Sequence, residues 1–436
     1  MRQCDAGSDP TGRLAQMQAA DPNILDAADP LARFADEFHH PQDVNGNRLI
    51  YLCGHSLGLQ PKSAPDYVEQ ELADWRRLGV LGHTHAKRPW IHYHEQAARG
   101  LAALVGGKHS EVVAMSSLTV NLHLMMVSFF RPGSTRNKVL IEKSAFPSDR
   151  YAVVSQLKFH GLSEADHLIE IEPHPGERCL ATSELIERIE REASRLAMVL
   201  LPGVQYLTGQ CLDLAPVIAA AHRVGATVGL DLAHAIGNTP LRLHDWGADF
   251  AVWCSYKYLN AGPGAIGGCF VNERYAADFE GPRFAGWWGH DKNLRFAMAP
   301  DFMPIRGAEG WQLSNPSVLS TAPLLASLDI FERAGPQRLR QKSIALSGYL
   351  RELLQGQLPD AEIITPPAAS ERGCQISLRL LGSAARATAL HERITAAGVI
   401  ADWREPDILR LAPVPLYNSY RDVHSAVAKI AYAIRS

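Results

Sequence analysis

The predicted fold is decided by two stretches, Thr-Val-Gly-Leu-Asp-Leu-Ala-His at residues 227–234 and Phe-Ala-Val-Trp-Cys-Ser-Tyr-Lys at residues 250–257. Each begins with an apolar run as long as a strand, and polar residues follow, Asp231 in the first and Ser255 to Lys257 in the second. Such short continuous runs are typical of strands buried on both faces, as in a parallel sheet. We therefore expect Asp231 and Lys257 at the carboxyl edge of one sheet, where open α/β folds bind ligands.

The flanking sequence repeats this alternation of a short apolar run and a longer amphipathic segment. The alternation predicts βαβ units, and hence an α/β fold with a mainly parallel sheet and helices on both faces. The seven expected strands are residues 112–115, 138–141, 168–171, 198–201, 227–230, 250–254 and 265–271. The main helices expected between them are residues 124–130, 148–159, 183–194 and 215–224.

The last hundred residues show a different order of apolar runs and amphipathic segments, which predicts a separate, smaller α+β domain. Its expected helices are 337–354, 384–397 and 420–434, and its expected strands include 362–365, 375–380 and 408–411. Residues 1–40 are rich in Ala, Asp, Pro and Gln, which indicates a loosely held arm or a surface helix. The expected division is an N-terminal arm and small-domain segment at 1–53, a large domain at 54–308, a connecting helix at 309–335 and a C-terminal small domain at 336–436.

The composition favours small, weakly charged partners. The 436 residues carry 43 Lys and Arg against 46 Asp and Glu, so a formal charge of −3 provides no basic surface for nucleic acid or an anionic membrane. The seven cysteines are scattered without a C-x-x-C pair, which argues against a disulfide framework or a structural zinc site. With neither a signal peptide nor an apolar run of about 20 residues, we expect a soluble cytoplasmic protein.

Two further segments follow expected strands and open helices. Ser116 to Thr119 offers hydroxyls and free backbone N–H groups that suit a phosphate, although an ordinary helix N-cap explains the same residues. Phe146 to Asp149 is open to the same reading, with Ser148 and Asp149 as caps and Phe146 in the core. A ring-shaped cofactor would instead stack on Phe146.

Asp231 and Lys257 each have an ordinary explanation when taken alone. An Asp after a strand is often a turn residue, and a Lys there is usually a solvated charge. Lys257, however, stands among aromatic residues before a Gly- and Pro-rich turn, where a partly desolvated amine becomes nucleophilic. A carboxylate for a pyridinium nitrogen, a Schiff-base lysine 26 positions later, a phosphate site and a stacking ring are the parts that pyridoxal 5′-phosphate requires. The large domain is then a cofactor-binding domain.

Arg410 lies inside the apolar run 408–411 and needs an anionic partner, for which a substrate carboxylate is a candidate. The pairs His83 with His85 and His92 with His94 have no cysteine nearby and Glu95 as the one acid close by, which is fewer ligands than a metal site needs. We therefore predict no metal.

At this point the chain resembles the kynureninases, which are pyridoxal phosphate enzymes of fold type I. The resemblance covers nearly everything after about Ala28. It rests on these motifs: YLCGHSLGLQP at 51–61, KRPW at 87–90, FPSD at 146–149, GVQY at 203–206 with TGQ at 208–210, DLAH at 231–234, WCSYKYLN at 253–260, WGH at 288–290, SNP at 314–316 and APVPLYN at 412–418.

The resemblance implies hydrolysis of L-kynurenine, or its 3-hydroxy form, to anthranilate or hydroxyanthranilate and L-alanine in tryptophan degradation. Lys257 would form the Schiff base and remove the Cα proton, Asp231 would pair with the pyridinium nitrogen, and Tyr256 would carry protons. The other implied cofactor contacts are Leu118, Thr119, Phe146, Pro147, Ser148, Asp149, His234, Tyr256, Trp287 and Asn315. The implied substrate contacts are Arg410 for the α-carboxylate, with His83, Ser314 and Asn315 near the aryl ketone. Trp287 and Asn315 typically come from the partner subunit, which implies a homodimer.

Two positions depart from the family pattern. His55 stands where Asn is common, and Pro202 stands where a hydroxyl residue is frequent, so no cofactor contact is assigned to Pro202. Two alternative functions stay open. One is a cysteine desulfurase with Cys374 in the segment Arg372-Gly373-Cys374, although that cysteine runs into an expected strand and fits a small buried residue. The other is a non-catalytic cofactor-binding protein.

Overall fold

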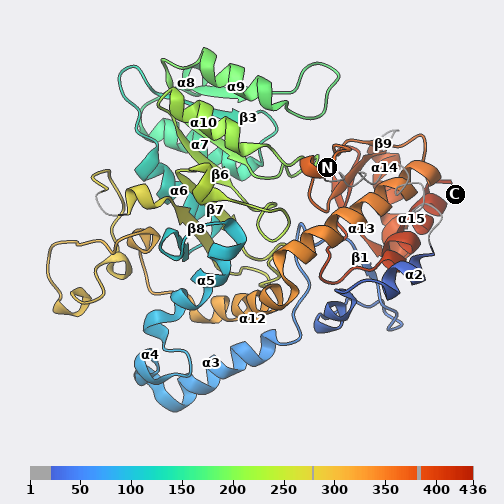
Figure 1. The fold of residues 1–436 in the computed structure, drawn as a ribbon, viewed down its shortest axis with the longest axis horizontal. Helices are drawn as coiled ribbons and strands as arrows, with labels where there is room; N and C mark the ends of the chain where they lie inside the picture. The colour runs from blue at the N-terminus through green and yellow to red at the C-terminus, as the bar shows by residue number, and fades with distance from the viewer. Residues whose placement is uncertain (1–20, 277–278, 381–383, 436) are drawn as a thin grey trace, which may run out of the picture.

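Seven strands form the central sheet of the computed structural model, which describes residues 21–276, 279–380 and 384–435 (Figure 1). β8 runs antiparallel to both of its neighbours, and every other adjacent pair is parallel. The predicted seven-stranded, mainly parallel sheet is confirmed. Across the sheet the strands are β2 (Val112–Ala114), β8 (Gly267–Val271), β7 (Phe250–Cys254), β6 (Thr227–Asp231), β5 (Leu196–Pro202), β3 (Lys138–Glu142) and β4 (Leu168–Ile171).

Helices connect the strands and cover the faces of the sheet, whose central strands β5 and β7 are buried almost throughout. These helices are α6 (Leu118–Phe129), α7 (Pro147–Phe159), α9 (Thr182–Arg191) and α10 (Leu214–Arg223), with the short α8 (Glu164–His167) and α11 (Leu243–Trp246). α6 begins earlier than its expected start at Leu124, and it includes the buried polar residue Asn121, whose amide donates to the carbonyl of Met115 (2.9 Å).

The C-terminal region forms a second sheet with its own hydrophobic core, as predicted. Its antiparallel strands are, in order, β12 (Asp402–Arg404), β13 (Ile408–Leu411), β10 (Ile376–Arg379) and β9 (Glu362–Ile363). The helices of this region are α13 (Pro336–Gln357), α14 (Ala384–Ala396) and α15 (Tyr420–Arg435). β1 (Ile50–Tyr51) pairs with β11 (Val399–Ile400), which ties an N-terminal segment to the smaller unit.

The expected loose arm at residues 1–40 is wrong for part of its length. Leu31, Phe34 and Phe38 are at most 1% exposed and belong to the core of the large unit. A buried ion pair between Asp29 and Lys342 (2.7 Å) also holds this segment. α2 (Pro22–Ala27) packs beside α15, and residues 1–20 lie outside the described part. The proposed domain boundaries at residues 53, 308 and 335 stay predictions.

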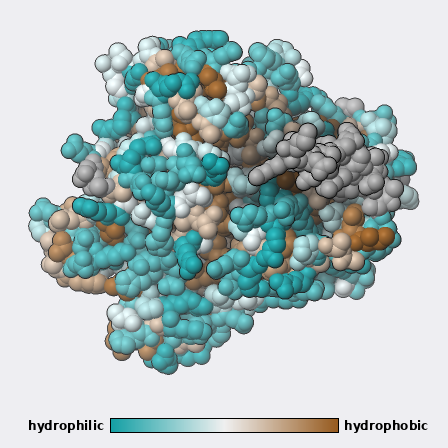
Figure 2. Space-filling view, viewed as in Figure 1, coloured by the Kyte–Doolittle hydropathy of each residue, from teal (hydrophilic) through white to brown (hydrophobic). Residues whose placement is uncertain are grey.

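Helices α3 (Ala64–Leu78), α4 (Gly82–His85) and α5 (Tyr93–Val105) lie on the α12 (Val318–Ala334) side of the molecule (Figure 1). α12 ends at Gly335, whose φ of 81° lets the chain turn directly into α13. Hydrophilic side chains cover most of the face shown in Figure 2. Within the described ranges, none of the helices has the length and hydropathy that crossing a bilayer requires.

Candidate active site

A cavity at the carboxyl ends of β3, β5, β6 and β7 collects most of the predicted site residues. It is lined by Leu118, Thr119, Ile141, Glu142, Ala145, Phe146, Ser148, Asp149, Leu200, Leu201, Pro202, Val204, Tyr206, Asp231, Ala233, His234, Tyr256 and Lys257. Pro147 sits between two lining residues at the first turn of α7. The carboxyl edge of the sheet thus brings together side chains that are more than a hundred residues apart in the sequence, as the strand pattern predicted.

One end of the cavity is built from the N-termini of α6 and α7. Ser117 precedes α6 in an extended conformation and makes no side-chain capping bond, so the first backbone N–H groups of the helix are free of a cap. The hydroxyls of Thr119 and Ser148 lie 3.0 Å apart and join the two helix starts. Backbone donors, hydroxyls and helix dipoles in one place favour an anion such as a phosphate.

Three carboxyl groups surround the middle of the cavity. Asp231, the last residue of β6, accepts a hydrogen bond from the backbone N–H of Ala233 (2.6 Å). Burial, and then the charge of Asp231, raises the pKa of Asp149 well above its usual value. Burial also raises the pKa of Glu142 to about 7. Asp231 thus lies beside two carboxyl groups whose pKa values burial raises.

Lys257 lies on a tight turn directly after β7. Its Nζ is 5.7 Å from the ring centroid of Phe146 and 6.0 Å from that of Tyr256. The backbone of Gly58 packs against this turn so closely that a Cβ there would lie 2.3 Å from the Lys257 carbonyl oxygen. Gly58 also donates its N–H to the carbonyl of Tyr256 (2.8 Å). The segment around Gly58 thus fixes the backbone on which Lys257 stands.

Two side chains beside Lys257 have defined proton states. Burial, and then the positive charge of Lys257, lowers the pKa of His234 well below its usual value, so its imidazole is neutral. Its Nδ1 is buried without a hydrogen-bond partner among the described residues. Burial raises the pKa of Tyr256, so its phenol keeps its proton at neutral pH.

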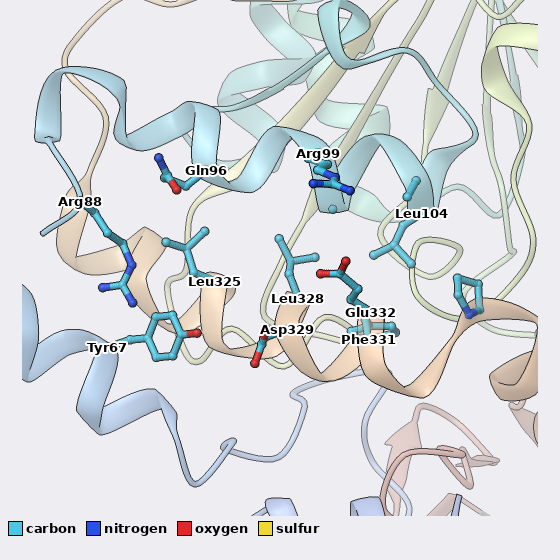
Figure 3. Close-up of a pocket in the computed structure, with 13 residues that line it drawn as sticks. Tyr67, Arg88, Gln96, Arg99, Leu104, Leu325, Leu328, Asp329, Phe331 and Glu332 are labelled. Carbon is cyan, nitrogen blue, oxygen red and sulfur yellow. The ribbon is translucent and has the colours of Figure 1, made fainter. Parts of the chain in front are cut away.

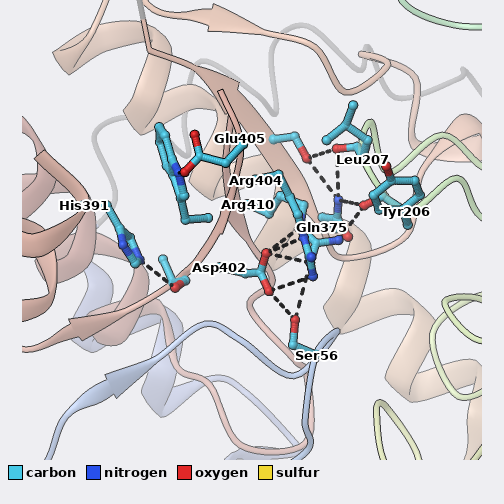
Figure 4. A network of polar contacts seen from close by, with 12 residues as sticks. Ser56, Tyr206, Leu207, Gln375, His391, Asp402, Arg404, Glu405 and Arg410 are labelled. Atoms are coloured by element: carbon cyan, nitrogen blue, oxygen red, sulfur yellow. Dashed lines mark hydrogen bonds and ion pairs between the residues drawn. The ribbon is translucent and has the colours of Figure 1, made fainter. Parts of the chain in front are cut away.

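Arg410 lies beside the cavity in a network of polar contacts (Figure 4). Its side chain is 1% exposed and pairs with Asp402 on the neighbouring strand β12 (2.7 Å). Another guanidinium N–H donates to the backbone carbonyl of Tyr206 (2.7 Å), and a third contact joins Ser56 (3.3 Å). The anionic partner that the sequence required is therefore Asp402 within this chain.

Glu142, Tyr206 and Asp402 belong to the site or its surroundings but were not predicted from the sequence. Glu142 ends an apolar strand, which is the same signal that identified Asp231, and it could have been found in that way. Asp402 faces Arg410 through a pairing of two strands that no local pattern reveals.

Four predicted residues lie away from the cavity within one chain. Trp287 is 43% exposed and donates its indole N–H to the carbonyl of Arg295 (3.1 Å). Ser314 and Asn315 are exposed on the segment before α12. His83 lies on α4, where its Nδ1 contacts the carbonyl of Val80 (3.0 Å).

A second cavity lies between α3, α5 and α12, where Tyr67, Arg99, Leu328 and Glu332 are among the lining residues (Figure 3). None of the predicted site residues lines it. We therefore assign the chemistry to the cavity that contains Lys257.

Cys374 is poorly suited to act as a nucleophile. It is fully buried, and its N–H donates to the side chain of Asn238 (2.9 Å). Burial raises the pKa of its thiol to about 12, which keeps the reactive thiolate form rare.

Solved structures of cysteine desulfurases share the fold of this chain. The enzyme from Thermococcus onnurineus NA1 is 16% identical with a TM-score of 0.74 and covers 95% of this chain and 98% of its own. The cysteine desulfurase CsdA from Escherichia coli is 17% identical with a TM-score of 0.74, covering 93% and 98%. At this identity the likeness concerns the fold, and it confirms the predicted fold class.

The sequence comparisons are more specific. The family described as "Kynureninase C-terminal domain" matches residues 339–430. A kynureninase of Koribacter versatilis (strain Ellin345) is 55% identical over 406 residues, which cover 93% of this chain and 95% of the relative. A kynureninase of Myxococcus xanthus (strain DK1622) is 53% identical over 405 residues, covering 92% and 94%. The chain therefore belongs to the kynureninase family.

Proposed function

We propose that this chain is a pyridoxal phosphate-dependent hydrolase that cleaves the Cβ–Cγ bond of L-kynurenine, or of 3-hydroxy-L-kynurenine. The products are anthranilate, or 3-hydroxyanthranilate, and L-alanine. One observation carries the proposal: a single cavity contains the amine of Lys257 and the carboxylate of Asp231, and Arg410 lies next to it. Membership of the kynureninase family supports the choice of substrate.

The residues of the cavity fit pyridoxal phosphate on their own chemistry. The uncapped start of α6, with the hydroxyls of Thr119 and Ser148, suits the phosphate. The ring of Phe146 offers a flat surface 5.7 Å from Lys257 Nζ, and Asp231 supplies a carboxylate for the pyridinium nitrogen. The orphaned Nδ1 of His234 and Oδ1 of Asp149 are further polar atoms in need of partners. Leu118, Pro147 and Tyr256 complete the proposed cofactor contacts within the chain.

The cofactor, when bound, accepts the electrons released at Cα of the amino acid. Lys257 would anchor the cofactor, and its free amine would take the Cα proton of the substrate. Asp231 would pair with the pyridinium nitrogen, and Phe146 would stack on the ring. The protonated phenol of Tyr256 lies next to Lys257, so Tyr256 would donate its proton to the substrate and regain one from the Lys257 ammonium.

We also propose a homodimer in which Trp287 and Asn315 reach the partner's cavity, with His83 and Ser314 near the aryl ketone. The exposure of Trp287, Ser314 and Asn315 within one chain supports this arrangement. A cytoplasmic location is supported by the free thiols, since all six described cysteines are unpaired.

The test is steady-state cleavage of L-kynurenine and 3-hydroxy-L-kynurenine, followed through the fluorescent aromatic amine. We expect the cofactor-loaded protein to cleave at least one of the two, and Lys257→Ala to cleave neither. Failure of the wild-type protein to cleave either substrate would contradict the proposed function and leave the fold unaffected.

A further inference from the structure

Tyr206 is the one member of the Arg410 network that lines the cavity. Besides Arg410, the residues labelled in that network include Ser56, Tyr206, Leu207, Gln375, Asp402 and Arg404 (Figure 4), and among all the labelled residues Tyr206 alone lines the cavity. Arg410 itself is 1% exposed. A carboxylate that approaches Arg410 from the cavity therefore meets Tyr206 first.

The backbone of Tyr206 is fixed on several sides. Its carbonyl accepts from Arg410 (2.7 Å) and from the side-chain amide of Gln375 (3.0 Å). The preceding residue, Gln205, accepts the backbone N–H groups of Leu207 and Thr208 (both 2.7 Å) and so closes the loop around Tyr206. The position of the tyrosine is thus set before any ligand binds.

The ring of Tyr206 lies between the proposed cofactor and the arginine. It meets the ring of Phe146 edge to face, with centroids 5.3 Å apart and planes at 85°. The guanidinium carbon of Arg410 is 5.9 Å from its centroid. The side chain of Tyr206 therefore reaches from Phe146 to the neighbourhood of Arg410, where we expect the substrate carboxylate to bind.

The phenol of Tyr206 has no hydrogen-bond partner among the described residues, although the ring is half-buried. Burial raises the pKa of the hydroxyl, which stays protonated at neutral pH and can donate. The guanidinium groups of Arg404 and Arg410 are close enough to act on that pKa in the opposite direction. Asp402 pairs with both guanidinium groups, at 2.9 Å from Arg404 and 2.7 Å from Arg410. The protonated phenol beside this network offers a hydrogen bond to an incoming anion.

We propose that Tyr206 is a substrate-binding residue whose hydroxyl donates a hydrogen bond to the α-carboxylate of the amino acid that Arg410 attracts. The inference rests on the proposed function for the identity of the substrate. It deepens that function by assigning a second carboxylate contact, which selects α-amino acids over amines with the same side chain.

The test compares Tyr206→Phe with the wild-type holoenzyme on two ligands that differ by the carboxylate alone, L-kynurenine and kynuramine. We expect KM for L-kynurenine to rise about tenfold or more, because a hydrogen bond to a charged group is lost, while kcat changes little. The inhibition constant of kynuramine should stay unchanged. Tyr151→Phe makes the same chemical change on the exposed face of α7 and should alter neither constant.

A second readout does not depend on cleavage. The cofactor absorbance change on adding L-alanine gives a dissociation constant, which should rise in Tyr206→Phe and in Arg410→Lys. An unchanged KM and an unchanged L-alanine constant in Tyr206→Phe would overturn the inference, and so would an equal loss of kynuramine binding. The wild-type protein could bind L-alanine in a Tyr206-dependent way and yet cleave no kynurenine. That result would contradict the proposed substrate and support the hydrogen bond from Tyr206 to the carboxylate.

Discussion

Asp231 and Asp149 line the same cavity as two neighbouring carboxyl groups. Asp149 is buried beside the charge of Asp231, and its pKa is raised by that burial and by that charge. Two close carboxyl groups in an apolar site cannot both ionise without a large cost. The two groups thus divide their proposed roles: the raised pKa of Asp149 favours its protonated form, and Asp231 is the carboxylate proposed for a pyridinium nitrogen.

Replacing Asp231 by Asn tests this division. The amide has nearly the same shape, so the protein should still bind pyridoxal phosphate, but it cannot hold a proton on the ring nitrogen. We expect kcat for the proposed cleavage to fall about a hundredfold or more, measured at equal cofactor content. Asp245→Asn, on the surface of α11, is the control and should keep wild-type activity. Wild-type kcat in Asp231→Asn would remove the carboxylate from the mechanism.

At the residue scale, the sequence predicted the groups that end strands. Asp231 and Lys257 are polar residues after apolar runs, and both line the cavity. Tyr206 and Asp402 could not be found in this way, because their roles depend on contacts with Arg410 across separate segments. Trp287 and Asn315 came from the resemblance alone, and their proposed roles need a second subunit.

Among the elements, β3 ends on a carboxyl group that opposes folding at high pH. Glu142 is 4% exposed, and its nearest donor is the amide of Gln205 at 3.4 Å. Burial raises its pKa from the usual 4.5 to about 7. Between these values the folded chain holds a proton that the unfolded chain has lost, so stability falls as pH rises. Below 4.5 the contribution is fully present, and above about 7 it is lost.

Glu142→Gln should abolish this dependence, because the amide carries no charge at any pH. We compare the free energy of unfolding of the variant with that of the wild-type protein. From about pH 5 to about pH 8, this difference should shift in favour of the variant by on the order of 3 kcal/mol. The measurement is urea unfolding of both cofactor-free proteins at the two pH values. A stability difference that does not change with pH would show that Glu142 ionises normally in the folded state.

For helices and strands, the hydrophobic pattern of the sequence predicted the elements that pack together in the large sheet. All seven strands of the large sheet were expected from apolar runs, because strands buried on both faces leave an unbroken apolar pattern. The N-terminal segment was misjudged because the polar and acidic residues around Leu31, Phe34 and Phe38 weaken its overall pattern, although these three residues follow one another at helical spacings and fill the core of the large unit. Contacts of that kind are decided by the tertiary fold.

At the scale of the whole molecule, the shared active site of the proposed dimer can be tested by mixing inactive subunits. Lys257→Ala and Asn315→Ala should each be inactive, or nearly so, as homodimers. In a mixed dimer, one cavity then combines an intact Lys257 with an intact Asn315 of the other chain. We expect mixing and reassociation to restore about a quarter of wild-type activity per total protein. No recovery in verified mixed dimers would mean that Asn315 acts within its own chain.

The central claim is that the cavity at the carboxyl edge of the sheet holds pyridoxal phosphate on Lys257. The most direct measurement is reduction of the cofactor-loaded protein with borohydride, followed by mass analysis of its peptides. We expect an absorption band in the wild-type protein, the reduced cofactor on the peptide that contains Lys257, and neither in Lys257→Ala. A wild-type protein that stays colourless after addition of the cofactor, or a cofactor attached at another lysine, would contradict it.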